Sequence, residues 1–431
     1  MTSSAVSLGP FPDDPLYAPA VELDATDPLA SYRDRFVDVD PELIYLDGNS
    51  LGRLPVEASA VINDVTDRQW GDRLIRSWNE GWWNLQLEIG DLLAPAIGAQ
   101  PGEVIISDST SVNLHKLAAA ALAARPGRTK IVTDDLNFPS DHYVLAEIAR
   151  AAGPAHRLEI VPSDGVMGPV EALVAAIDDT TALVSLSHTV FKSGYTYDLA
   201  ELTRIAHDAG ALILWDMSHS VGSVHADLTG AGADLAVGCT YKYLNGGPGS
   251  PAFLFVRSDL QEQLASPISG WWAHAEPFAF DLEFEPVTGI RKFHAGTMPT
   301  LSLAAAQPGI ALTVEAGMPA IRAKSISLMA FADRMFGAHL ESRGFTWASP
   351  TDPDRRGSHV SLRHPDAWQI TQALIADGKV LPDFRAPDNL RLGFGPLYTS
   401  HLDVHTSLMR LASVVDSDVW RSYPATADAV T

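Results

Sequence analysis

The sequence predicts an α/β protein, with a large domain built on a mainly parallel sheet between helices and a smaller α+β C-terminal domain. Short apolar segments alternate with amphipathic segments from about Val104 to Val256, a pattern typical of strands joined by helical crossovers. The apolar segments are largely apolar on both faces, as in a sheet that helices cover on both sides. From about Gly309 the chain changes to long amphipathic helices and short strands.

The alternating region defines most of the predicted elements. Strands are expected at 104–106, 130–132, 158–161, 182–186, 211–215, 233–237 and 252–256. Helices are expected at 111–124, after Pro139, at 170–177 and at 199–208. The last of these helices has its apolar residues on one face and ends at Gly210, a residue that favours helix termination.

The flanking segments are less regular. The N-terminal segment to about Pro41 is rich in Pro and Asp and predicts an irregular arm, and residues 44–52 predict a short strand running into a polar turn. Residues 56–96 look helical, with Trp70, Leu74 and Trp78 on one face and an apolar stripe continuing through Leu85, Ile89 and Leu92. We therefore divide the chain into an arm that joins the small domain (1–50), a large domain (51–308), a small domain (309–422) and a disordered tail (423–431).

Composition excludes several classes of protein. The formal charge of −23 over 431 residues argues against nucleic acid or an anionic membrane surface as the main partner. The N-terminus has neither the basic nor the apolar region of a secretory signal, and no apolar run is long enough to cross a bilayer. Cys239 is the single cysteine, so an intrachain disulfide framework is excluded and a reducing cytoplasm fits.

Lys242 stands out because it follows a predicted buried strand and leads into a glycine-rich turn. A lysine at a sheet exit is better explained as an amine nucleophile than as a surface charge, and the aldehyde of pyridoxal phosphate is the obvious carbonyl. Asp216 ends another buried strand, and a protonated pyridine nitrogen would pair with its carboxylate. His219 would orient Asp216 or lie near the ring. A loop lysine, a capping aspartate and a structural histidine are the plainer alternatives, and a metal held by Asp216 and His219 lacks a third ligand.

Two predicted helix starts could hold the rest of such a cofactor. Thr110 and Ser111 open a helix whose free N–H groups and partial positive charge suit a phosphate, although a simple N-cap is the better explanation of this signal on its own. Phe138 precedes Pro139 and could stack on a flat ring, or it could be an ordinary core residue.

Arg391 is the candidate for a substrate anion. Alternation in its predicted strand sends Leu390 and Leu392 to one face and Arg391 with Gly393 and Gly395 to the other. The flanking glycines would leave space for a planar anion such as an α-carboxylate, bound by two parallel hydrogen bonds. An exposed strand arginine is the alternative.

These motifs resemble those of kynureninase, a member of the fold-type I, aminotransferase class V group of pyridoxal-phosphate enzymes. The resemblance extends from about residue 45 to residue 400. Asp216 with Tyr241-Lys242 marks only the superfamily, whereas the runs at 138–141 and 270–274 and Asn245 are more specific. The matching stretches are 45–52, 70–78, 111–115, 138–143, 216–222, 241–249, 270–274 and 391–398.

The resemblance implies a role for each matching residue. Lys242 would hold the cofactor as a Schiff base, Asp216 would bind its ring nitrogen, and Phe138 would cover the ring. The remaining cofactor site would comprise Thr110, Ser111, Ser140, Asp141, His219 and Tyr241, with Thr110, Ser111 and Tyr241 at the phosphate. The family's active site is shared in a homodimer, so the second subunit would supply Trp271 and Thr297. The substrate site would comprise Arg391 at the carboxylate, Trp78 near the aromatic ring, Asn49 and Ser50. No metal is expected.

The resemblance also implies the reaction, which is hydrolytic Cβ–Cγ cleavage of kynurenine to anthranilate and alanine in tryptophan catabolism. Lys242 would remove the α-proton, and Tyr241 or His219 would face the oxyanion that forms at the γ-carbon. Residues 187–194 depart slightly from the family pattern. Trp78 together with Thr297 looks more like the bacterial enzymes, which favour kynurenine over 3-hydroxykynurenine.

Four other functions remain open on the sequence. A homologue that acts on a modified kynurenine in a biosynthetic pathway would look much the same. A class V aminotransferase shares the core motif, and a cysteine desulfurase needs a mobile cysteine, for which Cys239 is the single candidate. A non-catalytic scaffold that binds pyridoxal phosphate is the non-enzyme alternative, because a fold does not dictate a function.

Overall fold

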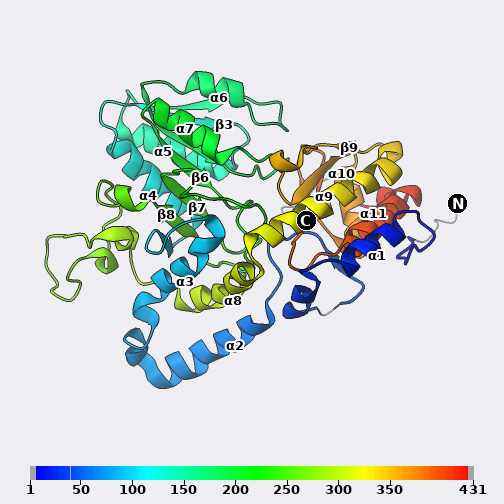
Figure 1. Cartoon of the computed structure of the whole chain (residues 1–431), viewed down its shortest axis with the longest axis horizontal. Helices are drawn as coiled ribbons and strands as arrows, with labels where there is room; N and C mark the ends of the chain where they lie inside the picture. The colour runs from blue at the N-terminus through cyan, green and yellow to red at the C-terminus, as the bar shows by residue number, and fades with distance from the viewer. Residues whose placement is uncertain (1–5, 39, 426–431) are drawn as a thin grey trace.

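The computed structural model of the chain describes residues 6–38 and 40–425, which form a large and a small domain side by side (Figure 1). The large domain contains a seven-stranded sheet with the order β2-β8-β7-β6-β5-β3-β4, in which only β8 runs against the other strands. The predicted mainly parallel sheet is therefore confirmed. The strands are β2 (Val104–Ile106), β3 (Lys130–Asp134), β4 (Arg157–Val161), β5 (Thr181–Ser187), β6 (Leu212–Asp216), β7 (Leu235–Gly238) and β8 (Phe253–Val256).

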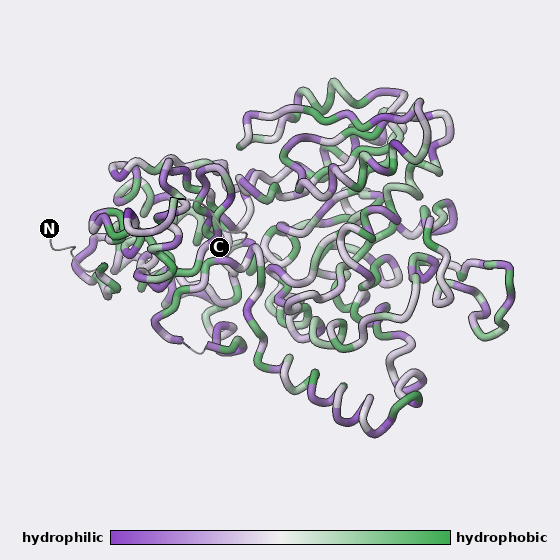
Figure 2. The backbone as a smooth tube through the Cα atoms, turned by 180° about the vertical axis from the view of Figure 1, so that it is seen from behind, coloured by the Kyte–Doolittle hydropathy of each residue, from purple (hydrophilic) through white to green (hydrophobic). Residues whose placement is uncertain are grey.

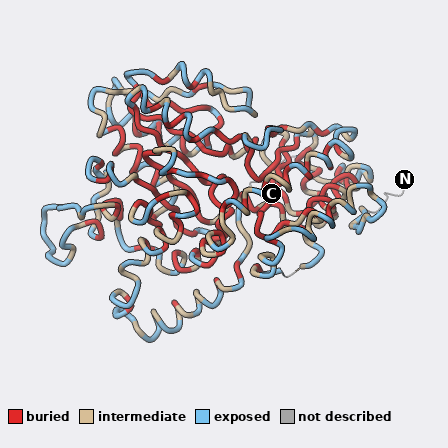
Figure 3. Tube along the Cα trace, in the orientation of Figure 1, coloured by how far each residue is buried: buried red, intermediate tan, exposed pale blue. Residues whose placement is uncertain are grey.

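Helices cover both faces of this sheet because successive strand residues point to opposite sides. Ile131 of β3 packs with α4 and α5, whereas its neighbour Val132 belongs to the core on the opposite face. The burial colours of Figure 3 follow this arrangement, with buried strands in the centre of the domain. The helices of the large domain are α2 (Val56–Asp64), α3 (Leu85–Leu93), α4 (Thr110–Ala123), α5 (Pro139–Ala152), α6 (Val170–Ala176), α7 (Leu199–Asp208) and α8 (Thr300–Ala316).

The small domain has its own core and a four-stranded antiparallel sheet with the order β12-β13-β10-β9. A second pair, β1 with β11, is parallel and joins the N-terminal part of the chain to this domain. The helices are α9 (Met318–His339), α10 (Ala367–Ala376) and α11 (His401–Asp416). The strands are β1 (Ile44–Tyr45), β9 (Thr346–Trp347), β10 (His359–Arg363), β11 (Val380–Leu381), β12 (Asp383–Arg385) and β13 (Asn389–Gly393).

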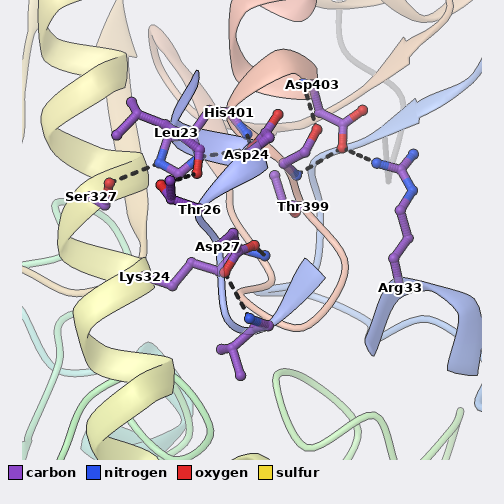
Figure 4. Close-up of polar contacts among 12 residues, drawn as sticks. Leu23, Asp24, Thr26, Asp27, Arg33, Lys324, Ser327, Thr399, His401 and Asp403 are labelled. Carbon is purple, nitrogen blue, oxygen red and sulfur yellow. Dashed lines mark hydrogen bonds and ion pairs between the residues drawn. The ribbon is translucent and has the colours of Figure 1, made fainter. Parts of the chain in front are cut away.

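The N-terminal segment is partly helical, so the prediction of an irregular arm is wrong. It forms α1 (Tyr17–Ala25) and a 3-10 turn at Ala30–Arg35, and α1 lies against α11. The acidic residues that suggested irregularity are anchors: Asp24 binds the start of α11 through His401, and Asp27 pairs with Lys324 of α9 at 2.6 Å (Figure 4). Ala20, Ile44 and Leu46 of this segment pack in the core of the small domain.

Residues 56–96 are largely helical, as expected, but they form several short helices rather than one, and Trp70, Leu74 and Trp78 do not share a face. After α2 the chain passes through a π-helical stretch at Val65–Arg73 and a 3-10 turn at Leu74–Trp78, and Leu74 has a left-handed φ of 53°. The chain leaves the direction of α2 after this stretch because Trp78 packs on Trp272, with ring centroids 4.7 Å apart. Trp70 and Leu74 are consequently exposed and do not share a buried face with Trp78. In Figure 2, α2 and this stretch lie at the edge of the molecule.

The boundary between the domains lies later than predicted. Gly309 is inside α8, which packs on α2 and α3 of the large domain. The apolar side chains change from one core to the other along α9, between Ile321 and Leu328. The predicted tail from residue 423 falls largely outside the described residues, which end at 425.

The buried ion pair of Asp27 and Lys324 generates the first prediction. Both side chains are about 5% exposed, so Lys324→Met would leave an uncompensated buried carboxylate and should destabilise folding by about 3 kcal/mol. Chemical denaturation followed by circular dichroism would measure the change. Arg204→Met in the exposed pair with Asp208 is the control and should cost less than about 1 kcal/mol. Equal effects of the two substitutions would contradict a buried anchor.

Candidate active site

The carboxyl ends of the parallel strands meet at one edge of the large sheet, and a cavity of about 460 Å³ lies there. Segments that follow β2, β3, β6 and β7 all reach it, as the sequence predicted. The lining includes the predicted cofactor residues Thr110, Ser111, Phe138, Ser140, Asp141, Asp216, His219, Tyr241 and Lys242.

Lys242 extends its amine into this cavity. Its Nζ lies 5.9 Å from the ring centroids of both Phe138 and Tyr241 and 3.3 Å from Nε2 of His219. Burial holds the pKa of His219 well below its usual value, and the nearby Lys242 lowers it further. His219 is therefore neutral at physiological pH and can accept a hydrogen bond from the lysine.

A tight turn fixes the main chain of Lys242. Asn245 adopts a left-handed φ of 56° and its N–H donates to the carbonyl of Lys242 at 2.8 Å. From the N-terminal segment, the N–H of Gly52 donates to the carbonyl of Tyr241 at 2.7 Å. A Cβ on Gly52 would meet the Lys242 carbonyl at 2.3 Å, so only glycine allows this approach.

Asp216 and Asp141 place two buried carboxyl groups on one side of the cavity. The N–H of Ser218 donates to Oδ1 of Asp216 at 2.8 Å. Burial raises the pKa of Asp141 well above its usual value, and the adjacent Asp216 carboxylate raises it further. Oδ2 of Asp141 has no hydrogen-bond partner among the described residues. This surplus of acceptors fits a protonated ring nitrogen, as pyridoxal phosphate would supply.

The first turn of α4 suits a phosphate. Ser109 is the N-cap and accepts from the N–H of Val112, and Thr110 and Ser111 line the cavity. Ser111 Oγ lies 3.3 Å from Ser140 Oγ at the start of α5, so hydroxyl groups of two helices converge. Free N–H groups and hydroxyls at a helix N-terminus are the usual protein partners of a phosphate.

Cys239 is unsuited to the role of a mobile nucleophile. Its side chain is about 1% exposed and Sγ contacts the carbonyl of Ser218 at 3.8 Å. Burial raises the pKa of its thiol, which lowers the fraction of reactive thiolate. The thiol and burial together raise the pKa of the Tyr241 phenol, which therefore keeps its proton.

Arg391 is buried rather than exposed, and it forms a bidentate ion pair with Asp383. The expectation of open space beside its glycines is wrong. A Cβ on Gly393 would collide with the Asn49 side chain, and one on Gly395 would collide with Tyr398. With its amide oxygen turned to the guanidinium, Asn49 accepts from Arg391 Nε at 2.7 Å, and Ser50 Oγ accepts from Nη2 at 3.2 Å.

Six predicted residues are absent from the described lining of this cavity, namely Asn49, Ser50, Trp78, Trp271, Thr297 and Arg391. Trp78 and Trp271 instead belong to an aromatic cluster with ring centroids 6.2 Å apart. Thr297 is exposed on the surface.

The sequence interpretation missed Asp383 and Arg385. A signal was present, because the segment 383–393 reads as a hairpin around Pro387 and Asp388, and such pairing sets Asp383 opposite Arg391. A buried arginine requires an acidic partner, and this register supplies it.

Solved structures of known proteins share this architecture. The apo cysteine desulfurase of Thermococcus onnurineus NA1 aligns with a TM-score of 0.74 at 19% identity, covering 92% of this chain and 98% of that one. A C-DES variant with glycine covalently linked to its pyridoxal-phosphate cofactor aligns with a TM-score of 0.75 at 19% identity, covering 88% and 98%. The large and small domains thus form the fold-type I architecture of pyridoxal-phosphate enzymes.

Sequence relatives narrow this class. The kynureninase of Burkholderia pseudomallei (strain 1106a) is 42% identical over 96% of this chain and 99% of its own length. That of Pseudomonas fluorescens is 42% identical over 92% of this chain and 95% of its own length. The family described as "Kynureninase C-terminal domain" matches residues 321–411, from the first turn of α9 into α11.

The chain belongs to the kynureninase family. It is a hydrolase that depends on pyridoxal phosphate and cleaves a carbon–carbon bond of kynurenine in tryptophan catabolism. The predicted fold class, cofactor and reaction are confirmed.

The Asp141–Asp216 pair predicts a pH dependence of the apoprotein. Because the folded-state pKa of Asp141 is raised, its stabilising contribution is present below the unfolded carboxyl pKa of about 4 and is lost as pH rises through the folded value. Asp141→Asn should therefore flatten the fall in melting temperature with rising pH. Thermal unfolding from acidic to neutral pH measures this, with exposed Asp208→Asn as the control. Parallel curves for wild type and Asp141→Asn would show that the pKa of Asp141 is not raised in the folded protein.

Proposed function

We propose that Lys242 carries the cofactor and acts as the proton-transfer base in kynurenine cleavage. The observation that supports this assignment is the placement of its amine between Phe138 and Tyr241, within 3.3 Å of the neutral His219. Bound pyridoxal phosphate supplies an electron sink for the carbanion character that develops at the substrate's α-carbon. Nζ of Lys242 takes the α-proton, and His219 Nε2 orients the amine by accepting its hydrogen bond.

The remaining residues of the proposed site hold the cofactor and the substrate. Asp216 would accept a hydrogen bond from the protonated ring nitrogen, with Asp141 as the second carboxyl group beside it. Phe138 would cover the ring. Thr110 and Ser111 would bind the phosphate at the start of α4. Arg391 binds the substrate carboxylate, next to Asn49 and Ser50.

Tyr241 is the better of the two candidates for the donor at the γ-oxyanion. Its raised pKa means that the phenol keeps its proton and can donate it to a developing alkoxide. His219 is also neutral, but the nitrogen it presents to the cavity faces Lys242. We assign Tyr241 this role and leave His219 as the partner of the lysine.

We further propose a homodimer with shared active sites. Large apolar side chains are exposed on two projecting segments, the π-helical stretch with its following turn and the loop before α8 (Figure 3). Ile75 is 76% exposed, Phe278 67% and Phe280 81%. Clusters of this kind mark protein interfaces. A second copy seated there would bring its Trp271 and Thr297 to a site that lacks them.

Two further proposals concern the location of the enzyme in the cell and its preferred substrate. None of the helices in the described part of the chain is long and apolar enough to cross a membrane, and we place the enzyme in the cytoplasm. We propose kynurenine as the preferred substrate, with 3-hydroxykynurenine or a modified kynurenine as the alternatives to compare directly.

Turnover tests the assignment of Lys242. The purified holoenzyme should convert kynurenine to fluorescent anthranilate and alanine. Lys242→Ala should lower kcat by at least about 10³-fold, because it removes both the attachment point and the base. Borohydride reduction followed by peptide mapping should label Lys242. A label on another lysine, or undiminished turnover in the variant, would overturn the assignment.

Hybrid dimers test the shared site. Lys242→Ala and Trp271→Ala homodimers should each be impaired, but a 1:1 hybrid mixture should recover about a quarter of wild-type activity, because each heterodimer contains one intact site. The two chains are co-expressed with different affinity tags, and kynurenine turnover is measured. A mixture no more active than the average of the two separate variants would exclude sharing.

A further inference from the structure

Asp383 is a buried carboxylate that two arginines share. Its side chain is 1% exposed, and its place in β12 sets it opposite Arg391 of β13. Oδ1 accepts from Arg391 Nε at 2.9 Å, and Oδ2 accepts from Arg391 Nη2. Oδ2 also pairs with Nη2 of Arg385 at 2.8 Å and accepts from Ser50 Oγ at 2.7 Å. The two guanidinium groups are thus held side by side.

Most of the N–H groups of Arg391 are already used. The single N–H of Nε is shared by Asp383 and Asn49, the two N–H groups of Nη2 bind Asp383 and Ser50, and Nη1 donates to the carbonyl of Phe191. A guanidinium has one N–H on Nε and two on each terminal nitrogen, so a single N–H of Nη1 remains. Bidentate binding of a carboxylate needs a second donor.

Arg385 has the donors that Arg391 lacks. Its Nη1 donates to the carbonyl of Phe384 at 2.9 Å and Nη2 faces Asp383, while Nε has no hydrogen-bond partner among the described residues. Its side chain is 36% exposed, whereas that of Arg391 is 1% exposed. Arg391 donates to the carbonyl of Phe191, whose ring centroid lies 6.5 Å from that of His219, so the arginine pair stands near the partner of Lys242.

The cluster of Arg385, Arg391 and Asp383 has a net positive charge, which would attract an anion. Burial raises the pKa of Asp47, and Asp383 raises it further, to about 7. Asp47 is therefore largely protonated below neutral pH. Burial would raise the pKa of Asp383, but Arg391 and Arg385 outweigh it and hold that pKa below its usual value, so Asp383 faces the two guanidinium groups as a carboxylate. One further negative charge would balance the cluster.

We propose that Arg385 is a second substrate-binding cation, which holds the α-carboxylate of an amino-acid substrate together with Arg391. Arg385 contacts one oxygen of the carboxylate through Nε, and Arg391 contributes the remaining N–H of its Nη1 to the other oxygen. Asp383 is the positioning residue that keeps the two guanidinium groups side by side. The inference rests on the proposed placement of the substrate carboxylate at Arg391.

A comparison of acid and amide ligands tests the proposal. Arg385→Gln should raise KM for kynurenine about 10- to 100-fold, as expected for lost charge-assisted hydrogen bonds, with a much smaller change in kcat. Arg385→Lys should recover part of the loss. For kynurenine carboxamide, which lacks the carboxylate, Arg385→Gln should change KM little. A merely structural role would affect acid and amide alike.

Arg363→Gln is the matched control, because Arg363 lies on β10 of the same small sheet and pairs with Asp388 at 2.7 Å on the surface. It should leave KM unchanged. An unchanged KM in Arg385→Gln, or an equal loss with acid and amide, would overturn the proposal.

A binding experiment separates this inference from the proposed function. L-alanine and L-alaninamide are titrated into holoenzyme while the visible absorbance of the bound cofactor is followed. Arg385→Gln should weaken L-alanine binding about 10-fold or more and leave L-alaninamide unaffected. If wild type binds L-alanine in this way but does not cleave kynurenine, the proposed function fails and the role of Arg385 stands. If kynurenine is cleaved but Arg385→Gln binds both ligands as wild type does, the role of Arg385 fails alone.

Discussion

The parallel register of β5, β6 and β7 determines the geometry of the site. Asp216 at the end of β6 pairs with Ser187 on one side and Val237 on the other. Its carbonyl accepts from the N–H of His188 at 2.8 Å, and the next N–H, of Met217, donates to Val237 at 2.7 Å. Main-chain hydrogen bonds in a dry core thus fix where the segment with His219 and the segment with Lys242 leave the sheet. Residues distant in sequence meet without help from their side chains.

Charge in this acidic protein is organised locally. At one end of the site, the Asp141 and Asp216 carboxyl groups lie together. Burial and the charge of Asp216 raise the pKa of Asp141. At the other end, Arg385 and Arg391 share the single ionised Asp383. Between them, His219 is kept neutral by desolvation. Such a gradient complements a cationic ring nitrogen at one end and an anionic carboxylate at the other, which the net charge of −23 does not reveal.

The large sheet and the Lys242 site could be predicted because their signals are local. Apolar segments of the right length fix the strands, and the residues that follow each strand fix the exits. Arg391 shows the limit of such reasoning. Alternation placed its face correctly, but the contents of the space beside it depend on Asn49, which arrives from another part of the chain. The interruption of the helical segment at Leu74 could not be predicted from the sequence either, because it depends on the packing of Trp78 against Trp272.

The short N-terminal segment 44–52 links the two ends of the site. β1 pairs with β11 in the small domain, and Gly393 next to Arg391 donates to the carbonyl of Leu46 at 2.7 Å. A few residues on, Ser50 binds Asp383, and Gly52 donates to the carbonyl of Tyr241 beside Lys242. Since a Cβ on Gly52 would collide with the Lys242 carbonyl, this segment has little room to shift by itself. A displacement of the arginine pair is therefore transmitted to the lysine turn through main-chain hydrogen bonds, so Arg385 and Arg391 are held in a fixed relation to Lys242.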